Sequence, residues 1–379
     1  MKKMTKVLTL LVSLLLGGGI GVGMIKMLER IPNLSDGQEL LLYTVGFVMI
    51  YVFYLLGIIV HEGGHLLCGL MTGWRFVSFR IANILWEREQ DGHIRRKKFS
   101  LAGTAGQCLL APPPWREKGF PYALYNMGGV IANLIAAAVC GLLAWVFWAR
   151  PLAAMLLIEG SFISLLQAVT NGIPLPGLTA SNDASNQLNM MRDVNARYAL
   201  WVEMSVAAAQ SEGKRLREMP DEWFVLPPEA DRSNELVATI EVFAANRRMD
   251  QLDLPGAEAA IRELLSRERG LVPLYRALLT LDGACCELLA GHPGDLTEAL
   301  ETPTVKQIMK AMKKYPAVLR AKYIAALLHD HDEEEAAAIL ETFEDVAEDY
   351  PFPQELDSER KLIAMATEAA GRAQEGDAP

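Results

Sequence analysis

Cysteine is scarce in this sequence, which contains five cysteines among 379 residues. They are Cys68, Cys108, Cys140, Cys285 and Cys286, and none belongs to a Cys-x-x-Cys pair. An odd number of cysteines fits no complete disulfide framework. We therefore expect reduced thiols that pack inside the protein rather than a disulfide scaffold.

Charge is missing from long stretches of the first half of the chain. Residues 40–60 contain no charged side chain, and 21 such residues are enough to cross a bilayer as a helix. Similar runs predict four membrane spans, at about 7–25, 40–72, 122–148 and 152–170. No clear small-x-small cleavage site follows the first run, so we expect it to remain as a helix.

The second half of the chain lacks any long uncharged run. Residues 181–379 contain 21 Lys and Arg against 37 Asp and Glu, whereas residues 1–180 contain 15 against 9. An acidic, water-soluble second half argues against nucleic acid as a main partner. Its periodic segments, broken by Pro and Gly, predict helices of 12–20 residues joined by short links, the first covering 185–211 and the last 355–370.

Stacked helical hairpins of the tetratricopeptide kind are the fold that these short helices predict. The fold class is therefore mainly α, with a polytopic transmembrane bundle and a soluble all-α domain. We assign residues 1–180 to the membrane domain, with a segment that continues to 186, and residues 187–373 to a cytoplasmic helical-repeat domain. Stacked helical hairpins form extended surfaces that bind proteins, so we expect a protein partner for this domain. Residues 374–379 are expected to be a disordered tail.

The stretch between the second and third spans predicts a membrane-associated β-hairpin over residues 74–101. The β-rich run 76–81 and the later Phe99 flank Asp91-Gly92, a strong turn signal. Residues 102–120, with Pro112-Pro113-Pro114, are expected to be irregular. This connection and the N-terminus are rich in Lys and Arg, so both are expected on the cytoplasmic side of the membrane. Two more spans bring the C-terminal half back to the cytoplasm, so we expect a multi-pass protein of the cell membrane. The three-Lys start and the large acidic domain favour a bacterial membrane.

Residues 61–65 read His-Glu-Gly-Gly-His directly after the uncharged run. Two histidines four residues apart share one helix face and suit a single zinc ion, with Glu62 placed to act on zinc-activated water. Ionisable groups in a membrane span are costly, so they are functional candidates. His65 would lie about 10 Å from the cytoplasmic end of its helix.

A catalytic zinc site needs a third protein ligand and an open position for water. Asp183 is the only carboxylate between Glu159 and Arg192, and it follows the fourth span. An anionic oxygen is a suitable third ligand, because its charge offsets part of that of Zn²⁺. The same residue would also serve as a helix N-cap, since Ser-Asn-Asp is a good helix start.

With these residues the chain resembles the site-2 protease family of intramembrane zinc metalloproteases. That family pairs a His-Glu-x-x-His helix with an aspartate near the start of a later one, and Gly129-x-x-x-Asn133 fits its Gly-x-x-x-Asn motif. The likeness covers residues 40–186, although Asn182-Asp183-Ala184 departs from the family's Asn-Pro-Asp-Gly pattern. It implies zinc, ligands His61, His65 and Asp183, and Glu62 as general base.

The resemblance also implies the reaction, which is hydrolysis of transmembrane segments of membrane proteins by zinc-activated water. Asn133 would hydrogen-bond the substrate or a ligand, with Gly129 and Asn171 supporting the site, although Asn133 also suits a plain interhelical hydrogen bond. Two alternatives stay open. A catalytically silent membrane scaffold would act through the helical domain and has no need of Glu62. A metal-binding transporter subunit would need more intramembrane carboxylates than this chain has.

Overall fold

The computed structural model describes residues 2–100, 104–175 and 181–376, and it is mainly helical. The chain forms two compact units. The first consists of Met1–Ile81, Ala105–Gly177 and Ser181–Arg192, and the second consists mainly of Ala82–Thr104 and Asp193–Pro379. The segment that follows β1, predicted as part of the membrane domain, thus groups with the C-terminal helices.

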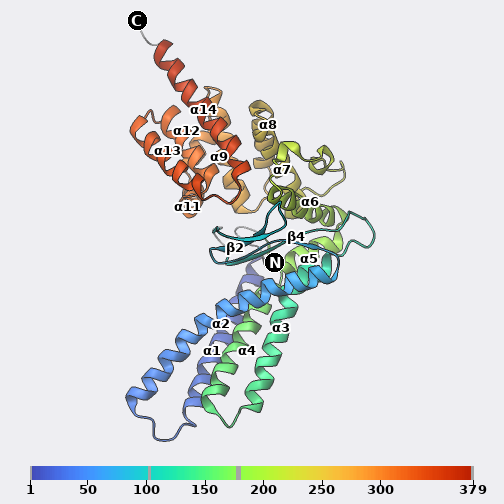
Figure 1. The fold of residues 1–379 in the computed structure, drawn as a ribbon, viewed down its shortest axis with the longest axis vertical. Coiled ribbons are helices and arrows are strands. Elements are labelled where there is room, and N and C mark those ends of the chain that lie inside the picture. Colours follow the sequence, from blue (N-terminus) through green and yellow to red (C-terminus); the bar gives the residue numbers. More distant parts are fainter. Residues whose placement is uncertain (1, 101–103, 176–180, 377–379) are drawn as a thin grey trace. The chain divides into compact units, whose positions relative to one another are not determined.

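The first unit is a bundle of four long helices, with a shorter helix and two strands at one end. Helices α1, α4, α3 and α2 lie side by side in Figure 1. The elements of this unit are α1 (Lys2–Leu28), α2 (Asp36–Met71), β1 (Arg75–Ile81), β4 (Gly106–Ala111), α3 (Tyr122–Val146), α4 (Pro151–Gly172) and α5 (Asp183–Arg192).

Three of these helices, α2, α3 and α4, are long and apolar enough to cross a membrane. Their outer surfaces expose large apolar side chains, among them Phe47 at 76 % and Trp145 at 73 % exposed, as expected of a surface that meets lipid rather than water. The predicted first span lies within α1, where the described apolar part is Gly17–Leu28. Several side chains of residues 7–16 lie outside the described set, so this span stays a prediction.

Helix α2 carries the His-Glu-x-x-His motif without interruption. It begins with a capping box, in which the Ser35 side chain accepts from the backbone N–H of Gln38 and the Gln38 side chain accepts from that of Ser35. Its 36 residues, with no proline inside, make a rod about 54 Å long. The helix ends at Met71, and Gly73 turns the chain into β1 with a positive φ of 89°.

The strands differ from those that the sequence predicts. The Asp91-Gly92 turn does close a hairpin, but it joins β2 (Ile84–Arg88) to β3 (Ile94–Lys98), because the chain already reverses at Ala82, where φ is +51°. The expectation that 102–120 is irregular is wrong at β4, which pairs antiparallel with β1 from Arg75 opposite Ala111 to Ile81 opposite Gly106. Residues 101–103 lie outside the described part.

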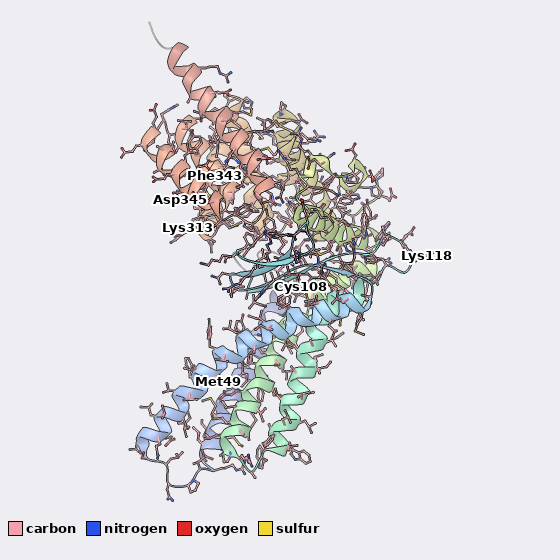
Figure 2. The ribbon with its side chains drawn as sticks, in the orientation of Figure 1. Met49, Cys108, Lys118, Lys313, Phe343 and Asp345 are labelled. Atoms are coloured by element: carbon pink, nitrogen blue, oxygen red, sulfur yellow. The ribbon has the colours of Figure 1, made fainter. Side chains whose placement is uncertain are left out.

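The second unit is a series of helices, each packed on its neighbours. These elements are α6 (Val194–Ser211), η1 (Leu216–Glu218), η2 (Asp221–Phe224), α7 (Glu235–Asp250), α8 (Leu254–Leu265), α9 (Pro273–Leu289), α10 (Asp295–Glu298), η3 (Ala299–Glu301), α11 (Pro303–Ala311), α12 (Pro316–Leu328), α13 (Glu333–Glu348) and α14 (Pro353–Gly376). Helix α6 packs on α7, α7 on α8 and α8 on α9, and α12 contacts α9, α13 and α14. The core includes Phe343, labelled in Figure 2 and 1 % exposed.

Two helix boundaries in this region correct the sequence prediction. The helix expected over 185–211 is two helices, α5 and α6, because the Asp193 side chain accepts from the backbone N–H of Asn195 and starts a new helix. Helix α14 continues to Gly376, so the first residues of the predicted disordered tail are helical, and the last three lie outside the described part.

Candidate metal centre

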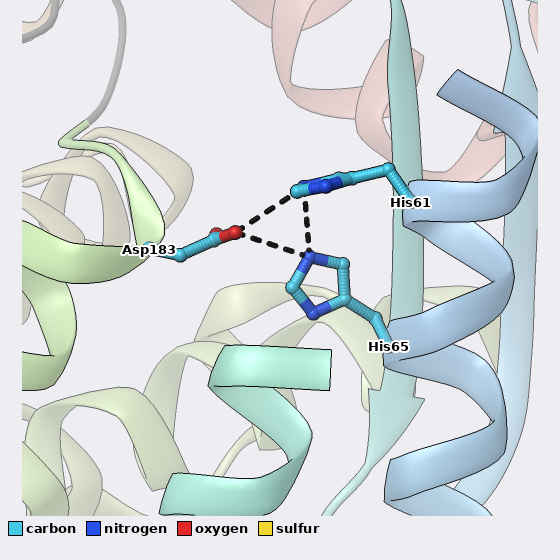
Figure 3. Close-up of side chains that lie close together, drawn as sticks. All are labelled: His61, His65 and Asp183. Atoms are coloured by element: carbon cyan, nitrogen blue, oxygen red, sulfur yellow. Dashed lines mark hydrogen bonds and ion pairs between the residues drawn. The ribbon is translucent and has the colours of Figure 1, made fainter. Parts of the chain in front are cut away.

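His61 and His65 are one turn apart on α2, and both rings point towards Asp183 at the start of α5 (Figure 3). Nε2 of His61 lies 3.2 Å from Nε2 of His65. The Asp183 Oδ2 atom lies 3.2 Å from Nε2 of His61 and 3.5 Å from Nε2 of His65. All three side chains are nearly enclosed, with between 11 and 18 % of each side chain exposed. Three ligand-type atoms thus form a small triangle.

The backbone of α3 fixes the chemical form of His65. Nδ1 of its ring lies 2.8 Å from the carbonyl oxygen of Tyr125. A carbonyl oxygen only accepts hydrogen bonds, so Nδ1 carries the proton, and in the neutral ring Nε2 keeps its lone pair. That lone pair faces His61 and Asp183. A hydrogen bond from the other ring nitrogen to a backbone carbonyl orients metal-binding histidines in many proteins.

The turn before α5 holds Asp183 in place. The Asn182 side chain accepts from the backbone N–H groups of Leu175 and Ser185 and donates to the carbonyls of Thr170 and Ile173. Burial by itself would raise the pKa of the Asp183 carboxyl, but the neighbouring rings of His61 and His65 lower it to about 2. The carboxylate therefore stays ionised across the physiological range, as a metal ligand must.

The backbone of Asp183 is also anchored from α3. Asn126 donates from Nδ2 to the Asp183 carbonyl oxygen at 2.8 Å, and the same amide lies 3.3 Å from Oε1 of Gln187. Asn126 is 7 % exposed, so this bond is shielded from water. Residues 176–180 lie outside the described part, so the anchors of Asp183 come from the segments on either side of them.

The triangle has dimensions that a metal ion such as zinc would fit. Zinc binds histidine nitrogen and carboxylate oxygen at about 2.0–2.2 Å, so neighbouring ligands of a tetrahedral ion are about 3.3–3.6 Å apart. The three separations in the structure are close to one face of such a tetrahedron. His61, His65 and Asp183 form the one group in the described residues whose ligand atoms are close enough together for a metal ion.

Helix α3 packs directly on the His61 ring. A Cβ atom added at Gly129 would lie 2.5–2.6 Å from three atoms of that ring, so only glycine lets the helix come this close. Asn133, which is fully buried, places its Nδ2 atom 3.3 Å from Nδ1 of His61 and 3.3 Å from Oε1 of Gln167. Asn133 therefore contacts a ligand and a neighbouring helix, a position that supports the metal centre.

Glu62 lies on α2 between the two histidines in sequence and beside the β4 strand in space. A Cβ atom at Gly106, the first residue of β4, would lie 2.6 Å from Oε1 of Glu62. The carboxylate interacts electrostatically with both histidines, with Asp183 and with Arg80 of β1. Arg80 is itself fully buried and donates to the carbonyl of Gly106 at 3.4 Å. Glu62 is thus held against the β1–β4 ladder, close to the triangle.

The structure brings together most of the residues that the sequence selects. His61, His65, Asp183, Asn133 and Gly129 meet at one point. Asn171 differs, because its Nδ2 donates to the carbonyl of Gln167 in its own helix and has no contact with the three ligands among the described residues.

Four contributors are missed by the sequence reasoning. They are the Tyr125 carbonyl, the side chains of Asn126 and Asn182, and Gly106. A backbone carbonyl has no signature in the sequence, and an asparagine that folds a turn looks like any other turn residue. Of the four, only Asn182 could have been suspected from the sequence, because it directly precedes the candidate ligand Asp183.

Substituting Gly129 tests how closely α3 must approach His61. We expect Gly129→Ala to displace the His61 ring and weaken zinc binding by about tenfold or more, a typical effect of a disturbed ligand support. Gly141→Ala is the matched control on the same helix, because a Cβ there meets only Ser161 Oγ at an ordinary 3.4 Å. A competition titration with a chromophoric chelator measures both variants. Equal affinities for the two would contradict the steric role of Gly129.

Comparison with known proteins gives this chain no relative. No protein-family model matches it, and no curated protein and no solved structure matches it. The geometry defines the class of the site. Two imidazoles from α2, a helix apolar enough to cross a membrane, and a carboxylate from α5 could hold a metal ion, and a glutamate of α2 lies beside them.

Proposed function

We propose that the protein is an intramembrane zinc endopeptidase that cleaves transmembrane segments of membrane proteins. The observation that carries this proposal is the triangle of His61, His65 and Asp183 with Glu62 beside it; the two histidines and Glu62 lie on α2, which is apolar enough to cross a membrane. Ionisable side chains in such a helix cost free energy, which a purely structural role would not need. A resemblance to site-2 proteases agrees with the same residues.

Two histidines and one carboxylate are a ligand set that catalytic zinc uses in soluble proteases. When bound, zinc would supply Lewis-acid chemistry, making water a nucleophile near neutral pH and polarising the peptide carbonyl. Glu62 would take the proton from the attacking water and then deliver it to the leaving amine. The Tyr125 carbonyl keeps His65 in the tautomer whose Nε2 can bind, and Asn133 orients His61.

The basic connection between α2 and α3 supports a cytoplasmic location for the end of α2 that carries the site. Nine Lys and Arg residues lie between Arg75 and Lys118, and such segments stay on the cytoplasmic side. The metal centre, near the end of α2 that leads into this connection, would be reached from the cytosol. We place the protein as a multi-pass protein of the cell membrane, of bacterial type, with both termini in the cytoplasm.

The helical C-terminal unit would bind a protein in this proposed function. Neighbouring helices packed one on the next form extended surfaces of the kind that recruit proteins. In this proposal the unit binds a protein partner or the substrate, and the membrane bundle performs the cleavage. A catalytically silent scaffold is the alternative, in which only the helical unit acts.

A comparison of membrane-protein fragments in cells separates the two. In cells with Glu62→Ala, we expect the fragments made by the wild-type protein to be missing and their full-length precursors to accumulate. Quantitative mass spectrometry of new peptide ends in the membrane fraction measures this. Glu39→Ala is the matched control, because Glu39 lies in the first turn of the same helix and is exposed. Identical fragment profiles for wild type and Glu62→Ala, under several growth and stress conditions, would favour the scaffold.

A further inference from the structure

The helical second unit contains a cavity of about 320 Å³ that the proposed proteolysis does not use. Its walls come from α7, α9, α12 and α14 and from the segment that follows α6. Three tyrosines, Tyr275, Tyr315 and Tyr350, contribute to the lining, and the rings of Tyr315 and Tyr350 meet edge to face at 6.4 Å. This volume is at the lower end of the range for small-ligand sites, which suits one long side chain with its backbone.

Carboxylates outnumber their cationic partners in the cavity wall. Asp282 and Glu359 share a single cation, Arg320, with N–O distances of 2.6 and 2.8 Å. Asp250 is bound by Arg215. Lys214, the third cation of the wall, pairs with Glu212 outside the cavity lining. Glu355 of α14 has no ion pair in the described part of the chain.

Neutral donors hold the remaining carboxylate. Glu355 accepts from the Tyr350 hydroxyl and from the Gln210 amide, each at 2.9 Å. Burial raises the pKa of Glu355 to about 7, which is the expected result when no cation offsets the loss of water. A cationic group beside Glu355 would make its ionised form favourable.

Arg320 has no charge to spare for Glu355. Its guanidinium, which lines the cavity and belongs to a residue 2 % exposed, is held by Asp282 and Glu359 and also interacts with the thiol of Cys285. A positive charge that balances Glu355 would therefore come from outside the protein.

We propose that this cavity binds a short peptide segment that carries an arginine or lysine side chain. The cation of that side chain pairs with Glu355 and lies over the rings of Tyr315 and Tyr350, as cations do on aromatic faces. One ligand side chain thus supplies the positive charge that the cavity wall lacks beside Glu355. Basic segments of this kind flank the cytoplasmic ends of membrane spans.

Binding of two matched peptides to the full-length protein in detergent tests the proposal. The probes are acetyl-Ala-Ala-Arg-Ala-Ala-amide and the same peptide with citrulline, which keeps the shape of arginine but carries no charge. We expect the arginine peptide to bind about tenfold or more tightly in isothermal titration, the effect of a hydrogen bond to a charged group. Equal affinities, or binding of neither peptide, would overturn the proposal without any protein variant.

Two variants locate the effect in the cavity. In Glu355→Gln, the preference for the arginine peptide is expected to fall to about twofold or less, because the ion pair is gone. Glu341→Gln on α13 removes an equal charge from an exposed position outside the cavity, and the preference should be unchanged. A full preference in Glu355→Gln would place the binding elsewhere. Since no cleavage is measured, the outcome is independent of whether the protein is a protease.

Discussion

Replacing His65 with alanine is expected to weaken zinc binding to the purified protein by about a hundredfold or more. His65 contributes one of three ligand atoms, and its ring is already oriented by the Tyr125 carbonyl. Zinc sites with four protein ligands bind with about 10–16 kcal/mol, so one ligand accounts for about 3 kcal/mol, or about two powers of ten. Metal content by mass spectrometry and a competition titration with a chelator measure the loss.

Two further variants sharpen this prediction. Asp183→Asn keeps the shape of the side chain but removes its charge, and we expect a similar loss of affinity because an amide oxygen is a poorer zinc ligand than a carboxylate. His93→Ala removes a histidine from the exposed turn between β2 and β3, and it should leave zinc binding unchanged. If Asp183→Asn bound one zinc ion as tightly as the wild-type protein, Asp183 would not be the third ligand.

Glu62→Gln is expected to reduce peptide hydrolysis by about 10²–10⁴-fold while the protein keeps its zinc. The amide of glutamine has the size of the carboxylate but cannot take a proton from water. Glu62 is outside the triangle of ligand atoms, so its loss should leave the metal in place. The measurement is the rate of cleavage of a substrate found by the cellular comparison, together with metal content on the same preparation.

Glu39→Gln serves as the control, since it makes the same change at the opposite, exposed end of α2. It should retain both zinc and activity. Cleavage at the wild-type rate by Glu62→Gln would rule out Glu62 as the general base even if the zinc site is correct. Loss of zinc in this variant would instead show that Glu62 is needed to build the site.

Much of the fold follows from the sequence because its strongest signals are local. The uncharged runs predict α2, α3 and α4 closely, since a chain in lipid must satisfy its backbone hydrogen bonds within a helix. The strands were less predictable. Gly106–Ala111 becomes a strand by pairing with a partner about 30 residues away, and nothing within 106–111 indicates that partner. The break at Asp193 depends on one capping side chain inside an otherwise helical pattern.

In the candidate site, too, some features follow from the local sequence and others depend on contacts between distant segments. His61, Glu62 and His65 are evident from their spacing alone, and Asp183 from being the only nearby carboxylate. That these residues meet depends on the packing of α5 on α3 and α4, which spacing along the chain does not reveal. Asn171 was expected to support the site, but its amide donates to the carbonyl of Gln167 in its own helix.

The glycines between α2 and α3 would restrict how a substrate enters the proposed protease. A Cβ atom at Gly64 would collide with the carbonyl oxygen of Gly128, and one at Gly128 with the carbonyl oxygen of Gly64. The two backbones therefore touch at the residue next to His65, and the His61 ring lies against Gly129. In the proposed protease, a polypeptide that arrives from the bilayer could not pass between α2 and α3 here without separating these helices. It would enter on another side of α2, so crosslinks that lock α2 to α3 should leave substrate entry intact.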